Sequence, residues 1–133
     1  MIRSILAAIA GLVAWFVVAT LGNILIRVLL PGYAAAEPAM AFTLPMMISR
    51  LILGALSSVA AGYLCAVLAR GRRDAVFGLA AVLLAGFVYV HIGLWPRFPV
   101  WYHAFFLLTL VPFVLLGARA ARHGGVTKET HRR

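Results

Sequence analysis

The chain has 133 residues, of which 65% are hydrophobic and only 11% are charged, and its mean hydropathy is +1.05. Soluble domains carry about 25% charged and about 45–50% apolar residues, so this composition excludes an ordinary soluble domain and favours one polytopic membrane domain. The net charge is +9. Because the cations lie between and after apolar segments, they indicate membrane topology rather than binding to nucleic acid.

Four apolar segments follow one another, and each reaches the about 20 residues that a helix needs to cross a bilayer. They cover residues 4–30, 42–69, 74–95 and 100–119, which form a predicted domain of residues 1–122 followed by a basic tail of residues 123–133. The sequence therefore predicts an all-α membrane fold with four transmembrane helices in an antiparallel bundle. Asp74 is the expected N-cap of the third helix.

The first segment also has features of a secretory signal, because Arg3 precedes it and Ala34-Ala35-Ala36 follows it. The apolar core of a signal peptide has about 7–15 residues, whereas this run covers residues 4–30. The first segment is therefore predicted to remain as a membrane helix.

The distribution of Lys and Arg predicts the orientation of the bundle. With four spans, nine cations lie on the side of the two termini and three lie on the other: Arg3, Arg70, Arg72, Arg73, Arg119, Arg122, Lys128, Arg132 and Arg133 against Arg27, Arg50 and Arg97. This excess places both termini in the cytoplasm, and we expect a bacterial inner (plasma) membrane.

Small residues form stripes that predict where helices approach closely. Gly54, Ser58 and Gly62 are spaced by four in the second segment, and Gly78 and Gly86 lie on a similar stripe in the third. Such stripes allow close backbone contact in lipid. The contact is either internal to the bundle or between copies of the chain. In the fourth segment, Pro112 predicts a kink.

Polar residues gather near the outer boundary of the membrane. At about 1.5 Å per residue, this level includes Asn23, Arg27, Arg50, His91, Arg97 and His103, together with Glu37 in the outer loop. The simplest interpretation is a membrane interface, at which arginines extend to headgroups and Glu37 pairs with Arg27 or Arg50. An aromatic belt at this level is expected to consist of Tyr33, Tyr89, Trp95, Trp101 and Tyr102.

Two other interpretations assign a site to this level. The three arginines would line a pocket for an anion or a lipid headgroup, since guanidinium suits phosphate and carboxylate. Alternatively, His91 and His103, which lie in one hairpin at equal depth, would ligate haem or a metal.

Other chemistry has little support in the sequence. Cys65 is the single cysteine, so the chain offers no internal disulfide and no cysteine-based metal set. No acidic residue lies deep within a predicted span, and no nucleophile–base pair or phosphate loop occurs. Ser57 and Ser58 are expected to bond back to their own helix. We therefore expect no enzyme activity, no metal and no cofactor apart from the haem alternative.

The run Phe98-Pro99-Val100-Trp101-Tyr102-His103, followed by an apolar helix ending at Leu116-Gly117, resembles the last hairpin of small four-helix bacterial inner-membrane proteins. That resemblance implies a topology and no activity.

The role expected first is an accessory or scaffold subunit that packs against membrane partners or itself, in contact with membrane lipid. The alternatives are a small oligomeric channel or transporter for an anionic solute or lipid, and a haem-binding membrane subunit.

Overall fold

The computed structural model describes the backbone of residues 1–130 and the side chains of residues 1–125, and this part of the chain is helical with short connections. Its elements are α1 (Ile2–Leu29), α2 (Tyr33–Ala36), α3 (Leu44–Leu68), α4 (Arg73–Leu94), the 3-10 turn η1 (Trp95–Arg97) and α5 (Val100–Thr130). Helices α1, α3, α4 and α5 are long and apolar enough to cross a membrane. The prediction of four helices that are long and apolar enough to cross a membrane is thus confirmed for the described residues.

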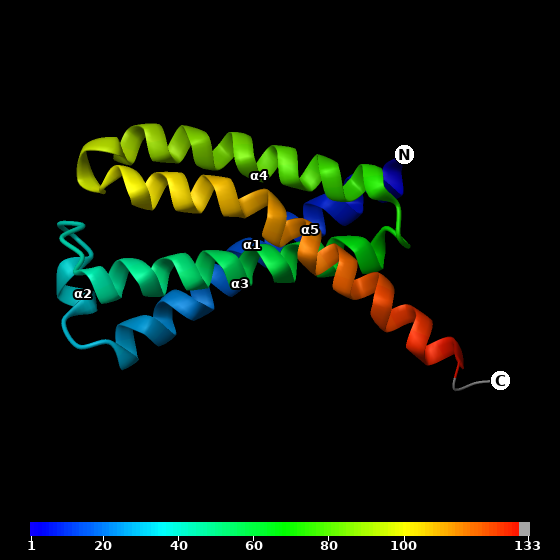
Figure 1. The fold of residues 1–133 in the computed structure, drawn as a ribbon, viewed down its shortest axis with the longest axis horizontal. Helices are drawn as coiled ribbons and strands as arrows, with labels where there is room; N and C mark the ends of the chain where they lie inside the picture. The colour runs from blue at the N-terminus through cyan, green and yellow to red at the C-terminus, as the bar shows by residue number, and fades with distance from the viewer. Residues whose placement is uncertain (131–133) are drawn as a thin grey trace.

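Helix α3 packs between α1 and α5, while α4 lies beside α5 and touches α1 (Figure 1). The α2 segment and the turn between α4 and α5 lie at one end of the molecule, here called the outer end. The turn between α3 and α4 lies at the opposite, inner end, together with the beginning of α1 (Figure 1). Helix α5 changes direction midway and contains Pro112, which agrees with the expected kink.

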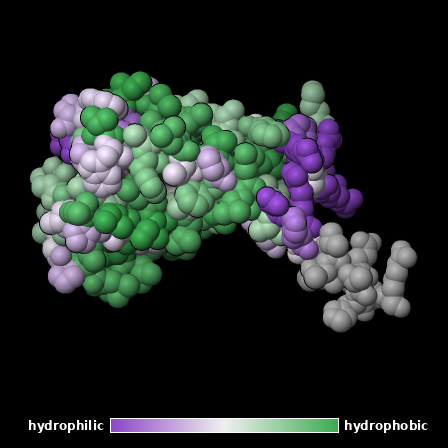
Figure 2. Space-filling view, in the orientation of Figure 1, coloured by the Kyte–Doolittle hydropathy of each residue, from purple (hydrophilic) through white to green (hydrophobic). Residues whose placement is uncertain are grey.

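A broad hydrophobic band separates the two ends of the molecular surface (Figure 2). At the inner end a strongly hydrophilic patch surrounds the α3–α4 turn, where Arg70, Arg72 and Arg73 are exposed. The outer end is only mildly polar in this view. This pattern is the one expected for a protein that presents apolar side chains to lipid and cations to a headgroup surface.

The ends of the helices follow from local backbone chemistry. Gly32, after α1, has φ +79, and Arg70 and Gly71, after α3, have φ 50 and 77. These left-handed residues end a helix and reverse the chain. Helix α4 begins at Arg73 with Arg72 as its N-cap, so the predicted N-cap at Asp74 is wrong.

The carboxylate of Asp74 instead accepts a hydrogen bond from the Ser4 hydroxyl of α1, at 2.8 Å. The last helix also extends further than its predicted span, because α5 continues beyond Arg119 to Thr130. The added residues include alanine and arginine, which are good helix formers. The predicted tail of residues 123–133 thus begins inside a helix, and its residues 131–133 lie outside the described residues.

The closest helix contact joins α3 to α5 through two glycines. A Cβ atom at Gly62 would overlap the backbone carbonyl of Val114, and a Cβ atom at Gly117 would overlap the backbone carbonyl of Val59. A Cβ atom at Gly54 would lie 2.7 Å from the Phe106 ring. These glycines therefore set the distance between the two helices.

Ser58 of the same predicted stripe is buried, accepts a hydrogen bond from the Trp15 indole at 3.0 Å and donates to the Gly54 carbonyl at 2.7 Å. The expectation that it bonds back to its own helix is confirmed. At the other stripe, a Cβ atom at Gly78 or Gly86 meets nothing within 4 Å, so these two glycines make no close helix contact inside the bundle. Helix α4 buries Val76, Leu79 and Leu83 instead, since larger apolar side chains fill the space beside α1 and α5.

Candidate functional site

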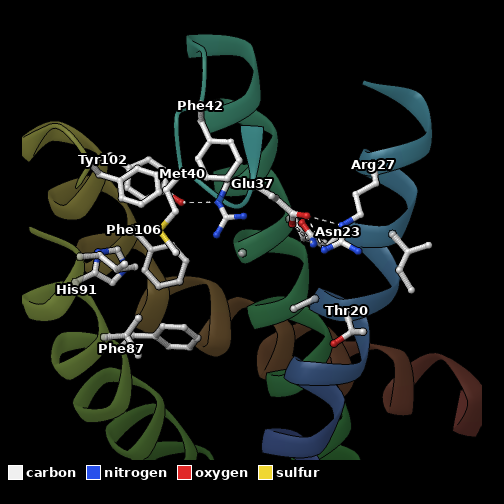
Figure 3. A pocket seen from close by; sticks show the side chains of 18 of the residues that line it. Thr20, Asn23, Arg27, Glu37, Met40, Phe42, Phe87, His91, Tyr102 and Phe106 are labelled. Carbon is white, nitrogen blue, oxygen red and sulfur yellow. Dashed lines mark hydrogen bonds and ion pairs between the residues drawn. The ribbon is translucent and has the colours of Figure 1, made fainter. Parts of the chain in front are cut away.

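A cavity of about 950 Å³ lies in the outer half of the molecule, between α1 and α4. Helices α3 and α5 form its back wall, and α2 with the following loop covers its outer end. In Figure 3, His91 and Tyr102 lie on one side of this cavity, and Asn23 and Arg27 lie on the other. We call this cavity the crevice.

On the α1 side of the crevice, the Glu37 carboxylate accepts hydrogen bonds from Asn23 and Arg27. Asn23 Nδ2 donates to Glu37 Oε1 at 2.8 Å, and Arg27 Nε donates to Glu37 Oε2 at 2.6 Å. Of the two predicted partners of Glu37, Arg27 forms the ion pair, since Arg27 Nη2 lies 2.5 Å from Glu37 Oε2. Burial raises the pKa of Glu37, but the hydrogen bonds from Asn23 and Arg27 and the nearby positive charges outweigh it and leave the pKa lowered. Glu37 is thus ionised at neutral pH.

A chain of hydrogen bonds connects this carboxylate to α3 and α5. Tyr33 donates its hydroxyl proton to Asn23 Oδ1 at 2.8 Å, and Arg50 Nη1 donates to the same Tyr33 hydroxyl at 2.7 Å. Arg50 Nε donates to the Tyr102 hydroxyl at 3.4 Å. The network joins α1, α2, α3 and α5 at the outer end. It also holds the Arg50 guanidinium on the crevice wall.

Arg50 is a half-buried cation without an anion beside it. Its guanidinium carbon lies 4.8 Å from the centre of the Phe42 ring, which provides some electrostatic compensation. None of the described acidic side chains lies within ion-pair distance of it, and the nearby Glu37 forms its ion pair with Arg27. The crevice wall therefore carries a half-buried cation that is held by two tyrosine hydroxyls and is not paired with a described acidic side chain.

The deeper half of the crevice is apolar. Trp15 of α1 and Phe87 of α4 have ring centroids 4.5 Å apart, and Phe87 and Phe106 have centroids 5.0 Å apart. These rings separate α1 from α4 and form the floor of the crevice, and Ala19 and Leu53 complete the lining at this depth. One cavity therefore joins a cationic half to a hydrophobic half.

The two histidines of the α4–α5 hairpin meet directly. His91 Nδ1 and His103 Nδ1 lie 2.6 Å apart, and both side chains are buried. The Trp95 ring stacks on His103 with centroids 4.7 Å apart. His91 lines the crevice, whereas His103 lies behind it, and the buried Nε2 of His103 has no hydrogen-bond partner among the described residues.

This geometry does not fit haem ligation by the pair. A metal–imidazole bond is about 2 Å long, so two nitrogens on opposite sides of one iron lie about 4 Å apart. The 2.6 Å contact between the Nδ1 atoms leaves no room for an iron between them. The Tyr102 ring stacks on His91 and the Trp95 ring stacks on His103, so aromatic side chains lie against both imidazoles.

The structure brings together some of the residues that the sequence singled out. Asn23, Arg27, Arg50 and His91 line the crevice. His103 does not line the crevice, but its ring contacts three residues that do, His91, Phe98 and Tyr102. Arg97 is exposed in η1 and does not line the crevice.

Sequence reasoning missed the aromatic partners of Arg50. Tyr33 and Tyr102, expected in an aromatic belt, are 0% and 5% exposed and bind Arg50. The interpretation of these two tyrosines as belt residues is wrong, because their hydroxyls take part in the buried network. Their position level with Arg50 was the available signal. Trp95, Trp101 and Tyr89 are exposed, as belt residues are.

The fold and the crevice define a small multi-pass helical membrane protein. Comparisons with known protein families, with curated proteins and with solved structures find no significant match to this chain.

Proposed function

We propose that this protein binds one anionic group in the crevice at Arg50 and that it has a binding role rather than an enzymatic one. The observation that supports the proposal is the Arg50 guanidinium, which faces a cavity of about 950 Å³ and has no acidic partner among the described side chains. Guanidinium binds carboxylate and phosphate through parallel hydrogen bonds, so either group is suitable.

The charges and donors of the site are consistent with one negative charge. Arg27 and Arg50 contribute two positive charges and Glu37 contributes one negative charge, which leaves a net charge of +1. The Tyr102 hydroxyl accepts from Arg50, and the described residues provide no acceptor for its own proton. Arg50 and Tyr102 thus provide two adjacent donors to an incoming anion.

Arg50→Gln should abolish anion-dependent stabilisation of the protein. A ligand at ten times its Kd stabilises the folded state by about 1.4 kcal/mol, and dodecyl phosphate added to protein in neutral detergent should raise the melting temperature accordingly. Losing a charged hydrogen-bond donor costs about 1.5–3 kcal/mol, so Arg50→Gln should weaken binding at least about tenfold. The readout is the reaction of buried Cys65 with a thiol-sensitive dye on heating.

Arg97→Gln is the matched control, because Arg97 is exposed and lies outside the crevice. It should keep the stabilisation by dodecyl phosphate, and Arg50→Lys should keep part of it because the charge remains without the planar fork. Equal stabilisation of the wild type and of Arg50→Gln would contradict the proposal.

We propose that the four membrane helices form an antiparallel bundle with both termini in the cytoplasm of a bacterial inner membrane. The support is the excess of cations at the inner end and the arrangement of the turns in Figure 1. A periplasm-active reporter fused to the C-terminus should be silent, and activity there would overturn the topology.

An accessory role is supported by a different surface. The outward face of α4 carries Gly78 and Gly86 without any neighbouring atom within 4 Å of a Cβ position, and such small residues allow a second helix to approach closely. We propose that a membrane partner or a second copy packs on this face. Gly78→Leu should then reduce the assembled mass measured in mild detergent, and an unchanged mass would contradict the proposal.

A further inference from the structure

The crevice covers the depth of one membrane leaflet. Arg27 lies near its polar end, and Trp15, twelve residues earlier on α1, lies at its apolar end. At about 1.5 Å per residue these positions are about 18 Å apart along the helix. One half of the hydrocarbon core is about 15 Å thick. A ligand that fills the crevice therefore reaches from the headgroup level to the bilayer centre.

The crevice also opens sideways toward the membrane. Toward the inner end α1 and α4 are in close contact, since a Cβ atom at Gly11 would lie 2.6 Å from Leu79 Cδ2. Toward the outer end the two helices are separated by the crevice, whose rim includes the exposed side chains of Thr20, Ile24 and Val90. A molecule that lies in the surrounding leaflet can enter between the helices without passing through water.

We infer that the occupant is a phospholipid with a monoanionic headgroup that enters sideways between α1 and α4. Its phosphate binds at Arg50 and Tyr102, and one acyl chain lies along the apolar floor formed by Trp15 and Phe87. This inference rests on the proposed anion site at Arg50 and adds the source of the anion and the direction of entry. A cavity of about 950 Å³ accommodates a headgroup with part of one chain, and the second chain stays in the lateral opening.

The net charge of the crevice distinguishes this lipid from its neutral counterpart. With Arg27 paired to Glu37, one positive charge remains at Arg50, and a phosphatidylglycerol headgroup neutralises it. A phosphatidylcholine headgroup brings a cation of its own to the same wall and gains less. Moving an acyl chain from the bilayer into the crevice exchanges one apolar environment for another. The preference for phosphatidylglycerol over phosphatidylcholine therefore comes from the headgroup charge.

Quenching of Trp15 by brominated lipid tests the position of the chain. The protein has three tryptophans, and Trp95→Phe with Trp101→Phe leaves Trp15 alone in the full-length chain. Trp15 is 6% exposed, so bulk lipid reaches its ring poorly. In nanodiscs of phosphatidylcholine, brominated phosphatidylglycerol should quench Trp15 at least about twofold more than brominated phosphatidylcholine at equal mole fraction. Arg50→Gln should remove this difference.

Two variants with the same added bulk separate the crevice from the rest of the surface. Ala19→Phe fills the apolar half without touching Arg50, whereas Ala81→Phe adds the same ring to an exposed position of α4 outside the crevice. Ala19→Phe should lower the excess quenching by phosphatidylglycerol to the level of phosphatidylcholine, and Ala81→Phe should leave it unchanged.

The soluble anion glycerol phosphate completes the experiment, with thermal stabilisation as its readout. Stabilisation by glycerol phosphate that depends on Arg50, combined with equal quenching by the two brominated lipids, would overturn the lipid inference and leave the anion site intact. No Arg50-dependent response to either probe would overturn both. Selective quenching that Ala81→Phe keeps and Ala19→Phe loses supports the lipid inference.

Discussion

Gly62→Ala should destabilise the protein by about 3 kcal/mol, at the upper end of the cost of overpacking, although it adds a single methyl group. The new Cβ atom would overlap the backbone carbonyl of Val114. A backbone carbonyl cannot move aside as a flexible side chain does, so α3 and α5 must separate and lose their mutual packing. The free energy of unfolding is measured by titration with sodium dodecyl sulfate in mild detergent.

Gly78→Ala is the matched control for this prediction. The same methyl group at Gly78 meets nothing within 4 Å, so the free energy of unfolding should change by less than about 0.5 kcal/mol. Gly117→Ala adds a methyl group to the same interface from α5, where it would overlap the Val59 carbonyl, and should destabilise like Gly62→Ala. Equal stability of Gly62→Ala and Gly78→Ala would show that the α3–α5 contact is looser than the structure indicates.

Removing one histidine of the buried pair should cost more than removing both. His91→Phe leaves His103, which is 1% exposed, without a partner for either ring nitrogen. An unsatisfied buried polar group costs about 1–3 kcal/mol. The double variant His91→Phe with His103→Leu removes both polar groups and should recover most of that loss, because replacing both partners by apolar groups is nearly neutral.

The double-mutant cycle for this pair should give a coupling free energy of about 1–2 kcal/mol. Tyr89→Phe, at a side chain that is 80% exposed, is the control and should have no effect on unfolding. Additive effects of the two histidine substitutions would show that the rings do not share a hydrogen bond. Both measurements use the same detergent titration, so the two interfaces are compared on one scale.

Several features were predictable because their causes are local. The four spans follow from apolar length, and the ends of the first two follow from Pro31-Gly32 and Arg70-Gly71, where left-handed residues stop the helices. The pairing of Glu37 with Arg27 follows from a short connection that keeps the two side chains at one level. The level of Asn23, Arg27, Arg50 and His91 follows from the helical rise.

Other features were decided by which helix faces meet. Gly62 faces α5 whereas Gly78 faces outward, although both lie on stripes of small residues. Tyr33 and Tyr102 are buried beside Arg50, although tyrosines at this depth are typical of the membrane interface. The carboxylate of Asp74 binds Ser4 of another helix instead of capping its own.

The sequence by itself determined that this is a helical membrane protein with four apolar spans, a cationic inner end and polar residues at the outer level. Only the tertiary structure decided that Arg50 faces a crevice, that Trp15 and Phe87 floor it, and that His91 meets His103. The physical reason is that lipid accepts apolar residues on every face of a helix, so hydrophobic periodicity does not mark the inward face. Close packing of glycines and aromatic rings decides which face of each helix points inward, and this packing depends on all four helices at once.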